Sequence, residues 1–197
     1  MIVLGITGGI ASGKTTITTF LKNKGFEIHD SDLVVKKLYS NPPTIFLKHL
    51  QKISLSGAIK NKKINTHIIR EEIFQNKKKK ENLEKFIHNE VRKSREIFLK
   101  KNKKEKTKIV ILDIPLLFEA RLAHLCDYII VLYLSKKIKI QRALTRKGMT
   151  KNILLKIIKS QLSDAHKKRK ADFVINTSKS KKDTFKRILK IINNIIT

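Results

Sequence analysis

Short runs of apolar residues, each stopped abruptly by glycine or polar residues, recur along the chain. The first run, MIVLGIT at residues 1–7, ends at Gly8 and Gly9, as expected for a buried parallel strand that meets a tight turn. The later runs are also short enough to be buried strands. The pattern therefore predicts five strands, at residues 1–7, 26–29, 109–113, 128–134 and 172–176.

Amphipathic stretches alternate with these strands. Residues 15–24 form the first, which Gly25 ends, and residues 33–39 follow the turn and N-cap residues 30–32. Apolar residues at helical spacing predict further helices at residues 135–147, 151–168 and 181–196. A strand, a helix and a strand within about 30 residues require a crossover connection. We therefore expect an α/β fold in three layers, α/β/α, around a five-stranded parallel sheet.

The stretch from Asn41 to about residue 106 follows a different pattern. It has no strong strand signal, and its apolar residues, such as Ile68, Leu83 and Val91, recur at near-helical spacing. Its lysine-rich runs, at residues 77–80 and 101–106, are most simply exposed helix ends or loops. We expect a helical insertion in the sheet domain.

Composition limits the class of protein. With 197 residues, of which 41% are hydrophobic, the chain can bury a core and is too apolar for wholesale disorder. Its single cysteine, Cys126, excludes an intramolecular disulfide and a cysteine-rich zinc site. The N-terminus lacks a secretory signal, and no apolar run reaches the roughly 20 residues that span a bilayer. We expect a soluble, cytoplasmic protein with no membrane partner.

The charge balance admits two interpretations. Lys and Arg number 45 against 16 Asp and Glu, a formal net charge of +29, which favours polyanionic partners such as nucleic acid or nucleotides. The lysines, however, are spread over predicted strands, helices and loops alike. Compositional drift explains that spread better than a single basic groove does, so position rather than total charge must identify the site.

Residues 8–15, GGIASGKT, match the phosphate-binding pattern GxxxxGK[ST]. The match lies between the first predicted strand and the first predicted helix, which is the context that this loop needs. Glycines let backbone N–H groups approach phosphate oxygens, and the helix N-terminus adds partial positive charge. Lys14 is expected to reach the β- and γ-phosphates, and the Thr15 hydroxyl to bind Mg²⁺. The residues predicted here to bind ATP are Gly8, Gly9, Ile10, Ala11, Ser12, Gly13, Lys14, Thr15 and Thr16.

Carboxylates follow two other predicted strands, at the sheet edge where ligands bind in folds of this kind. A carboxylate after the second strand can accept the proton of an attacking hydroxyl, as a kinase needs. For Asp30, capping of the next helix explains the residue equally well, and Asp32 is the better candidate base. Asp113 ends the third strand and either acts on Mg²⁺ or its waters or only forms a turn. Glu119 lies near the same edge, after Pro115 breaks the strand.

Two arginines stand out because arginine is scarce here relative to lysine. Arg142 and Arg146 are four residues apart, which would place them on one face of the helix predicted at 135–147. Their guanidinium groups can bind phosphates bidentately and close over the transferred group as a lid. The alternative is an ordinary solvated helix face, but the phosphate loop favours the lid.

The order of these motifs resembles the dephospho-CoA kinase family, whose members use ATP to phosphorylate the ribose 3′-hydroxyl of dephospho-CoA in the last step of coenzyme A synthesis. The resemblance runs through nearly the whole chain, and its TGGI and PLLFE stretches are far more specific than a phosphate loop alone. It is carried by TGGIASGKTT at residues 7–16, DSD at 30–32, REEIF at 70–74, FIHNE around His88, DIPLLFE at 113–119, QRALTR at 141–146 and ADFVIN at 171–176.

The resemblance implies three parts: a nucleotide-binding core at residues 1–32, 107–134 and 171–197, a helical CoA-binding domain at 33–106, and a lid with its following helix at 135–170. It implies Asp32 as the general base, assisted by Lys14 and Arg142. Implied contacts to dephospho-CoA come from Asp32, His88, Pro115, Leu116, Leu117 and Glu119, and further contacts to ATP come from Arg146 and Asn176. Mg²⁺ is implied at Thr15, with Asp113 as a candidate second ligand.

The implied partners are ATP and dephospho-CoA, with no specific nucleic acid, for a monomer or weak homo-oligomer. The chain departs from the family pattern at Asn89, where proline usually follows the histidine, and at Thr177 and Ser178, where glycine is typical. His88 also fits a solvated helix residue.

Two other functions fit the core motif. Another small-molecule kinase, of the nucleoside monophosphate type, would share the loop, but PLLFE and the helical insertion favour dephospho-CoA. A nucleic-acid-binding P-loop ATPase is supported only by the net charge, and 6% aromatic residues without Trp give no evident stacking platform for bases.

Overall fold

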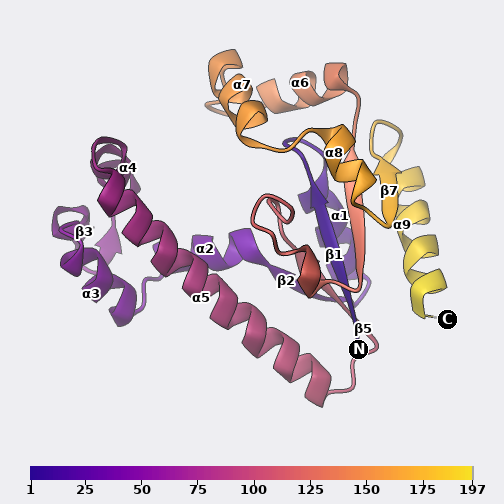
Figure 1. Cartoon of the computed structure of the whole chain (residues 1–197), viewed down its shortest axis with the longest axis horizontal. Helices are drawn as coiled ribbons and strands as arrows, with labels where there is room; N and C mark the ends of the chain where they lie inside the picture. Colours follow the sequence, from indigo (N-terminus) through magenta and orange to yellow (C-terminus); the bar gives the residue numbers. More distant parts are fainter. Residues whose placement is uncertain (197) are drawn as a thin grey trace. The chain divides into compact units, whose positions relative to one another are not determined.

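The chain folds into two units, which the computed structural model describes over residues 1–196. Five parallel strands form the centre of unit 1 (Figure 1). Unit 1 comprises Met1–Asp30 and the chain from Lys101 onward, and unit 2 comprises Ser31–Lys100. The strands of unit 1 are, in spatial order, β2 (Glu27–Asp30), β5 (Ile109–Asp113), β1 (Ile2–Gly8), β6 (Tyr128–Tyr133) and β7 (Phe173–Asn176), and every neighbouring pair is parallel. The predicted α/β fold around a five-stranded parallel sheet is confirmed.

Helices cover both faces of this sheet. On one face, α1 (Lys14–Asn23) and α9 (Lys181–Ile196) bury apolar side chains such as Ile17 and Ile188 against those of the strands. The rings of Phe20 and Phe185 stack between the two helices, with centroids 3.9 Å apart. On the other face, α8 (Asp164–Arg169) contacts β6, and the short 3₁₀ helix η2 (Ala123–Leu125) contacts β1. The central strand β1, which leads into the phosphate loop, is therefore enclosed on both sides.

Two helix predictions were wrong in their extent. The helix predicted at 135–147 ends at Leu144, as α6 (Lys136–Leu144), because the chain turns through Thr145 and then through Gly148, whose φ is +77°. The helix predicted at 151–168 is two helices, α7 (Lys151–Ser160) and α8. They are separated because Ser163 caps α8, accepting a hydrogen bond from the N–H of His166.

Unit 2 contains α2 (Ser31–Ser40), α3 (Thr44–Lys52), the 3₁₀ helix η1 (Ser56–Ala58), α4 (Thr66–Gln75) and most of α5 (Lys77–Lys104). Phe46, Leu50 and Leu83 belong to its separate apolar core. It also contains a small antiparallel hairpin, β3 (Ile59–Lys60) and β4 (Lys63–Ile64), where the sequence pattern gave no strand signal. Strands of two residues are too short for an alternating pattern. The hairpin depends instead on its turn, in which Asn61 and Lys62 both have positive φ.

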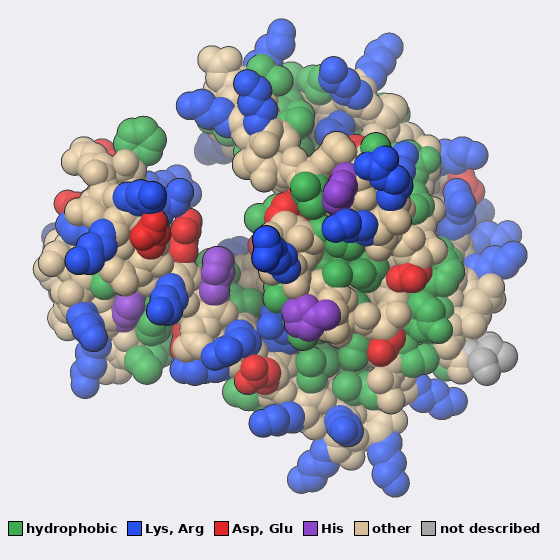
Figure 2. All heavy atoms as spheres, viewed as in Figure 1, with side chains coloured by type: hydrophobic (Ala, Val, Ile, Leu, Met, Phe, Trp, Pro, Cys, Tyr) green, Lys and Arg blue, Asp and Glu red, His purple; other side chains and the backbone are tan. Residues whose placement is uncertain are grey.

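The positive charge is not confined to one segment of the chain, since Lys and Arg occur throughout the sequence. On the face that Figure 2 shows, Lys and Arg side chains are scattered over both units. Within residues 1–196, none of the helices combines the length and the apolar content that crossing a bilayer requires.

Candidate active site

The phosphate loop turns tightly between β1 and α1. Gly8 is needed for packing, since a Cβ atom there would lie 2.6 Å from both the backbone oxygen of Leu132 and Oγ of Ser12. Ala11 and Gly13 have φ values of +62° and +81°, so the backbone curls tightly, and the N–H of Ser12 donates to the backbone oxygen of Gly9 at 3.1 Å. Helix α1 begins at Lys14, one residue before the predicted start. A helix N-terminus that follows such a curl is suited to binding phosphate.

Lys14 and Asp113 form an ion pair at the carboxyl ends of the strands. Their side chains are 12% and 2% exposed, and Asp30 on β2 is in register with Asp113 on β5. Burial raises the pKa of Asp113 above its usual range, and the negative charge of Asp30 adds to this, whereas the Lys14 ammonium opposes it. The carboxylate of Asp113 and the ammonium of Lys14 balance each other's charge in this ion pair.

Thr15 and Asp113 supply the kinds of donor that Mg²⁺ prefers, a hydroxyl and a carboxylate oxygen. Thr15 is exposed in the first turn of α1, as is Thr16. Within residues 1–196, no group of three or more His, Cys, Asp and Glu could hold a metal ion by itself. The residues therefore fit a Mg²⁺ ion that is shared with bound phosphates rather than held in a cage of protein ligands.

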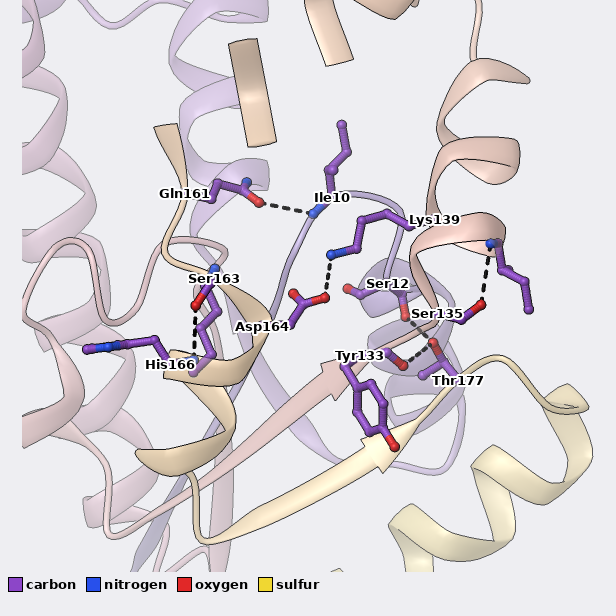
Figure 3. Close-up of polar contacts among 12 residues, drawn as sticks. Ile10, Ser12, Tyr133, Ser135, Lys139, Gln161, Ser163, Asp164, His166 and Thr177 are labelled. Carbon is purple, nitrogen blue, oxygen red and sulfur yellow. Dashed lines mark hydrogen bonds and ion pairs between the residues drawn. The ribbon is translucent and has the colours of Figure 1, made fainter. Parts of the chain in front are cut away.

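The segment between α7 and α8 supports the phosphate loop from the side. The N–H of Ile10 donates to Oε1 of Gln161 at 3.2 Å. Asp164, at the start of α8, forms an ion pair with Lys139 of α6 next to this contact (Figure 3). Ala11 is buried with Ala143 of α6 and Leu154 of α7. The loop is thus held by elements about 130 to 150 residues further along the chain, and no local pattern in the sequence connects them with it.

Thr177, which follows β7 at the carboxyl edge of the sheet, also anchors the loop. Its buried hydroxyl lies 2.9 Å from the backbone oxygen of Ser12 and 3.1 Å from that of Tyr133, and its single hydrogen is shared between these two acceptors (Figure 3). The side-chain oxygen of Asn176 accepts a hydrogen bond from the N–H of Ser178 at 2.8 Å, so this predicted ATP contact shapes the turn after β7. Sequence reasoning missed the role of Thr177, although its departure from the family pattern marked the position.

The DIPLLFE segment has a different role at each end. Thr7 donates to the backbone oxygen of Pro115 at 3.0 Å, and Leu116 is 43% exposed. Leu117 is fully buried, so its side chain packs in the core and is not open to a substrate, contrary to its predicted contact. Glu119, at the other end, accepts hydrogen bonds inside the protein.

Glu119 and Lys167 form a buried ion pair. Oε1 of Glu119 lies 2.8 Å from Nζ of Lys167, whose residue is fully buried, and accepts the N–H of Leu162 at 2.9 Å. Burial alone would raise the pKa of Glu119, but the hydrogen bonds and the charge of Lys167 lower it below its usual range. Glu119 therefore joins DIPLLFE to the segment that supports the loop, a role that its predicted contact with substrate did not include.

Glu119→Gln is expected to destabilise the protein by about 3 kcal/mol, because it leaves the Lys167 ammonium buried without a counter-charge. The melting temperature should fall by about 6–12 °C. Glu119→Gln/Lys167→Met should recover most of this loss. Because the pKa of Glu119 is lowered by folding, its carboxylate contributes to the free energy of unfolding at neutral pH. This contribution is lost as the pH falls through the folded-state pKa.

Glu105→Gln is the matched control for this substitution. Glu105 lies 3.8 Å from Lys101 at an exposed helix end, where loss of an ion pair has little effect. Equal melting temperatures for the two glutamine variants would contradict a stabilising role for the buried pair.

The two candidate lid arginines do not share a helix face. Arg142 is half-buried on α6, whereas Arg146 is exposed beyond the end of that helix, in the turn where its N–H donates to the backbone oxygen of Ala143. The predicted pairing on one face was wrong because the helix ends two residues before Arg146. Arg142 remains on the same helix as Lys139 and Ala143.

The remaining predicted site residues lie in unit 2. Asp32 is exposed in the first turn of α2. His88 is exposed on α5 and lines an open pocket of about 620 Å³. The other residues around this pocket are His49, Asn82, Lys85, Phe86, Asn89 and Arg92. Its cations suit an anionic ligand, and the imidazole of His49 stacks on Phe86 at 4.3 Å.

A phosphate loop between β1 and α1, with its lysine paired to a carboxylate at the carboxyl edge of a parallel sheet, defines a nucleotide-binding protein of the P-loop class. Comparisons with known proteins specify the family. The family model described as dephospho-CoA kinase matches residues 2–183. The chain belongs to the dephospho-CoA kinase family, which confirms the resemblance found in the sequence.

Full-length relatives agree with this assignment. The chain is 34% identical to the dephospho-CoA kinase of Fusobacterium nucleatum over 196 residues, covering 99% of each chain. It is 36% identical to that of Rickettsia typhi over 197 residues, covering 99% of this chain and 98% of the relative.

Solved structures also match over most of their length. The dephospho-CoA kinase from Campylobacter jejuni has a TM-score of 0.73 at 28% identity, with 98% of this chain and 96% of that chain covered. A protein from Thermus thermophilus has a TM-score of 0.80 at 22% identity, with 100% and 98% covered, which shows the shared fold.

Proposed function

We propose that the protein transfers the γ-phosphoryl group of ATP to the ribose 3′-hydroxyl of dephospho-CoA, giving coenzyme A and ADP. The observation that carries this proposal is the family match over residues 2–183, which includes both the phosphate loop and DIPLLFE.

Asp32 is the residue that we propose as general base. Its exposed carboxylate in the first turn of α2 is accessible to a bound hydroxyl. It would take the proton as the 3′-oxygen bonds to the γ-phosphorus and the bond to the β,γ-bridging oxygen breaks, which leaves ADP. Such a transfer depends mainly on alignment and charge neutralisation and needs no covalent intermediate.

Lys14 and Arg142 are the cations that we propose for the transferred group. Lys14 already lies at the end of the phosphate loop, where Asp113 neutralises it. Arg142 would approach from α6, and its guanidinium can bind two phosphate oxygens at once. Closure of this lid would exclude water, which would otherwise hydrolyse ATP.

Thr15 and Asp113 are the residues that would hold Mg²⁺ together with the phosphates of ATP. When bound, the ion would neutralise the charge that develops on the β- and γ-phosphate oxygens.

Unit 2 is the part that we propose for binding dephospho-CoA. Support comes from its pocket around His88, where Lys85 and Arg92 provide positive charge for a polyanionic substrate. We further propose a cytoplasmic monomer or weak homo-oligomer that needs no nucleic acid. On the face that Figure 2 shows, Lys and Arg side chains are scattered rather than gathered in one patch, which supports the last point.

A coupled assay of ADP release tests the function. Dephospho-CoA, AMP, other nucleosides and RNA are offered separately with ATP and Mg²⁺, and the product of the first reaction is identified by mass. We expect turnover with dephospho-CoA to exceed that with any other acceptor. Turnover confined to AMP, or stimulated only by RNA, would contradict the proposal.

A further inference from the structure

Lys139 is a cation of α6 that lies directly against the phosphate loop. Its side chain is only 13% exposed and forms an ion pair with Asp164, which is 26% exposed. A methyl group added at Gly9 would lie 3.1 Å from Oδ1 of Asp164 and 3.5 Å from Nζ of Lys139. Figure 3 shows the ion pair beside the loop residues Ile10 and Ser12. Both charges are therefore close to where the loop would receive phosphate.

The two charges have opposite effects on a phosphate chain bound there. An ammonium group attracts phosphate, and a carboxylate repels it. Together the two charges are locally neutral, which limits the cost of burying either one. Polyphosphate brings several negative charges to the loop and competes with Asp164 for the lysine. The flexible four-carbon stem of lysine allows its ammonium to change partner without movement of the helix.

Helix α6 is placed for this exchange. Ala143 on α6 is buried with Ala11 of the loop, so the helix is packed against the loop. Arg142, the proposed lid arginine, is three residues from Lys139 and thus on the same side of the helix. Ser135 caps the start of α6, accepting the N–H of Ile138.

We propose that Lys139 binds the polyphosphate chain of the nucleoside triphosphate, and that Asp164 neutralises Lys139 until the nucleotide binds. The ammonium then transfers from Asp164 to a phosphate oxygen. This inference rests on the proposed kinase function for its physiological ligand, but nucleotide binding alone tests it. Asp164 acts as a competitor of the phosphates for Lys139, and its presence weakens nucleotide binding.

The test is calorimetric titration with a non-hydrolysable ATP analogue and Mg²⁺, without an acceptor. Lys139→Gln should weaken binding about tenfold, as expected for loss of one charge-assisted contact. Asp164→Asn should tighten binding about threefold or more, because Lys139 no longer has a competing partner. Lys139→Gln/Asp164→Asn should bind like Lys139→Gln alone, and Lys139→Arg should retain most of the affinity.

Lys136→Gln is the matched control, because Lys136 is an exposed lysine of the same helix. It removes the same charge and should change the affinity less than twofold. The melting temperature of each variant establishes that it is folded.

Three results would overturn the proposal. Weaker binding by both Lys139→Gln and Asp164→Asn would mean that the ion pair only stabilises the structure of the loop. Equal tightening by Asp164→Asn with and without Lys139 would mean that Asp164 only repels phosphate directly. Unchanged affinity in Lys139→Gln would mean that the lysine does not reach the nucleotide. A failure of the proposed kinase function can be distinguished from a failure of this inference. In that case the unmodified protein would not turn over dephospho-CoA, while the variants would still show the expected changes in nucleotide affinity.

Discussion

Asp32→Asn should lower kcat with dephospho-CoA by about 10²- to 10⁴-fold, while the affinity for ATP changes by less than about twofold. The amide keeps the size and polarity of the side chain but cannot accept the proton of the 3′-hydroxyl. Because Asp32 is exposed at the start of α2, the substitution should leave the fold unchanged. Steady-state kinetics at saturating substrates and a separate ATP titration give the two quantities.

Asp30→Asn is the comparison that identifies the base. Asp30 lies two residues earlier, at the end of β2 and in register with Asp113, and its loss should lower kcat by less than about tenfold, below the usual contribution of a general base. Wild-type kcat in Asp32→Asn, or a larger loss in Asp30→Asn, would refute the assignment of Asp32.

Lys14→Met should lower kcat/KM for ATP by about 10²- to 10³-fold, through loss of a fixed positive charge at the phosphates. It also removes the counter-charge of Asp113, whose side chain is 2% exposed. Measurements of ADP release and of thermal unfolding on the same samples separate the two effects. Lys14→Met/Asp113→Asn removes both charges and should restore stability without restoring activity.

The stability of Lys14→Met should depend on pH. Burial raises the pKa of Asp113 and Lys14 opposes that rise, so the pKa in the variant is higher still. A carboxyl group whose pKa is raised by folding contributes stability at low pH, and this is lost as the pH rises through the folded-state pKa. The variant should therefore be closer to wild type in melting temperature at about pH 5 than at about pH 8. If the melting temperature of the variant were below that of wild type by the same amount at both pH values, the role of Lys14 as the counter-charge would be contradicted.

The regular elements of unit 1 could be predicted because their signals are local. The helix expected at 181–196 has those bounds, since Ile188 and Ile192 recur four residues apart on the face that packs on the sheet. The break between α7 and α8 could not be predicted in the same way. Leu154, Ile158 and Leu162 continue the helical spacing across it, while the partners of the segment lie far away in the sequence.

The residues of the site also divide into those that a local sequence pattern indicates and those whose role depends on distant partners. The phosphate loop is a contiguous motif whose letters specify its shape, so Lys14 and Thr15 could be named from the sequence. The residues that support the loop, Gln161, Asp164 and Thr177, are ordinary polar residues in their own segments. Their role depends on tertiary contacts that no local pattern indicates. For Leu117 the motif was misleading. It suggested a contact with substrate, whereas the side chain is buried in the core.

The wide sequence separation of these supports has a consequence for the order of folding. Ile10 reaches its partner 151 residues later, and Ser12 reaches Thr177 165 residues later. Contacts over such separations require that the entropy of closing the intervening chain be overcome. The loop can therefore have both of these supports only once the chain has been made as far as Thr177. ATP, which stabilises whatever state binds it, would act on the completed chain and not on its partly folded precursors.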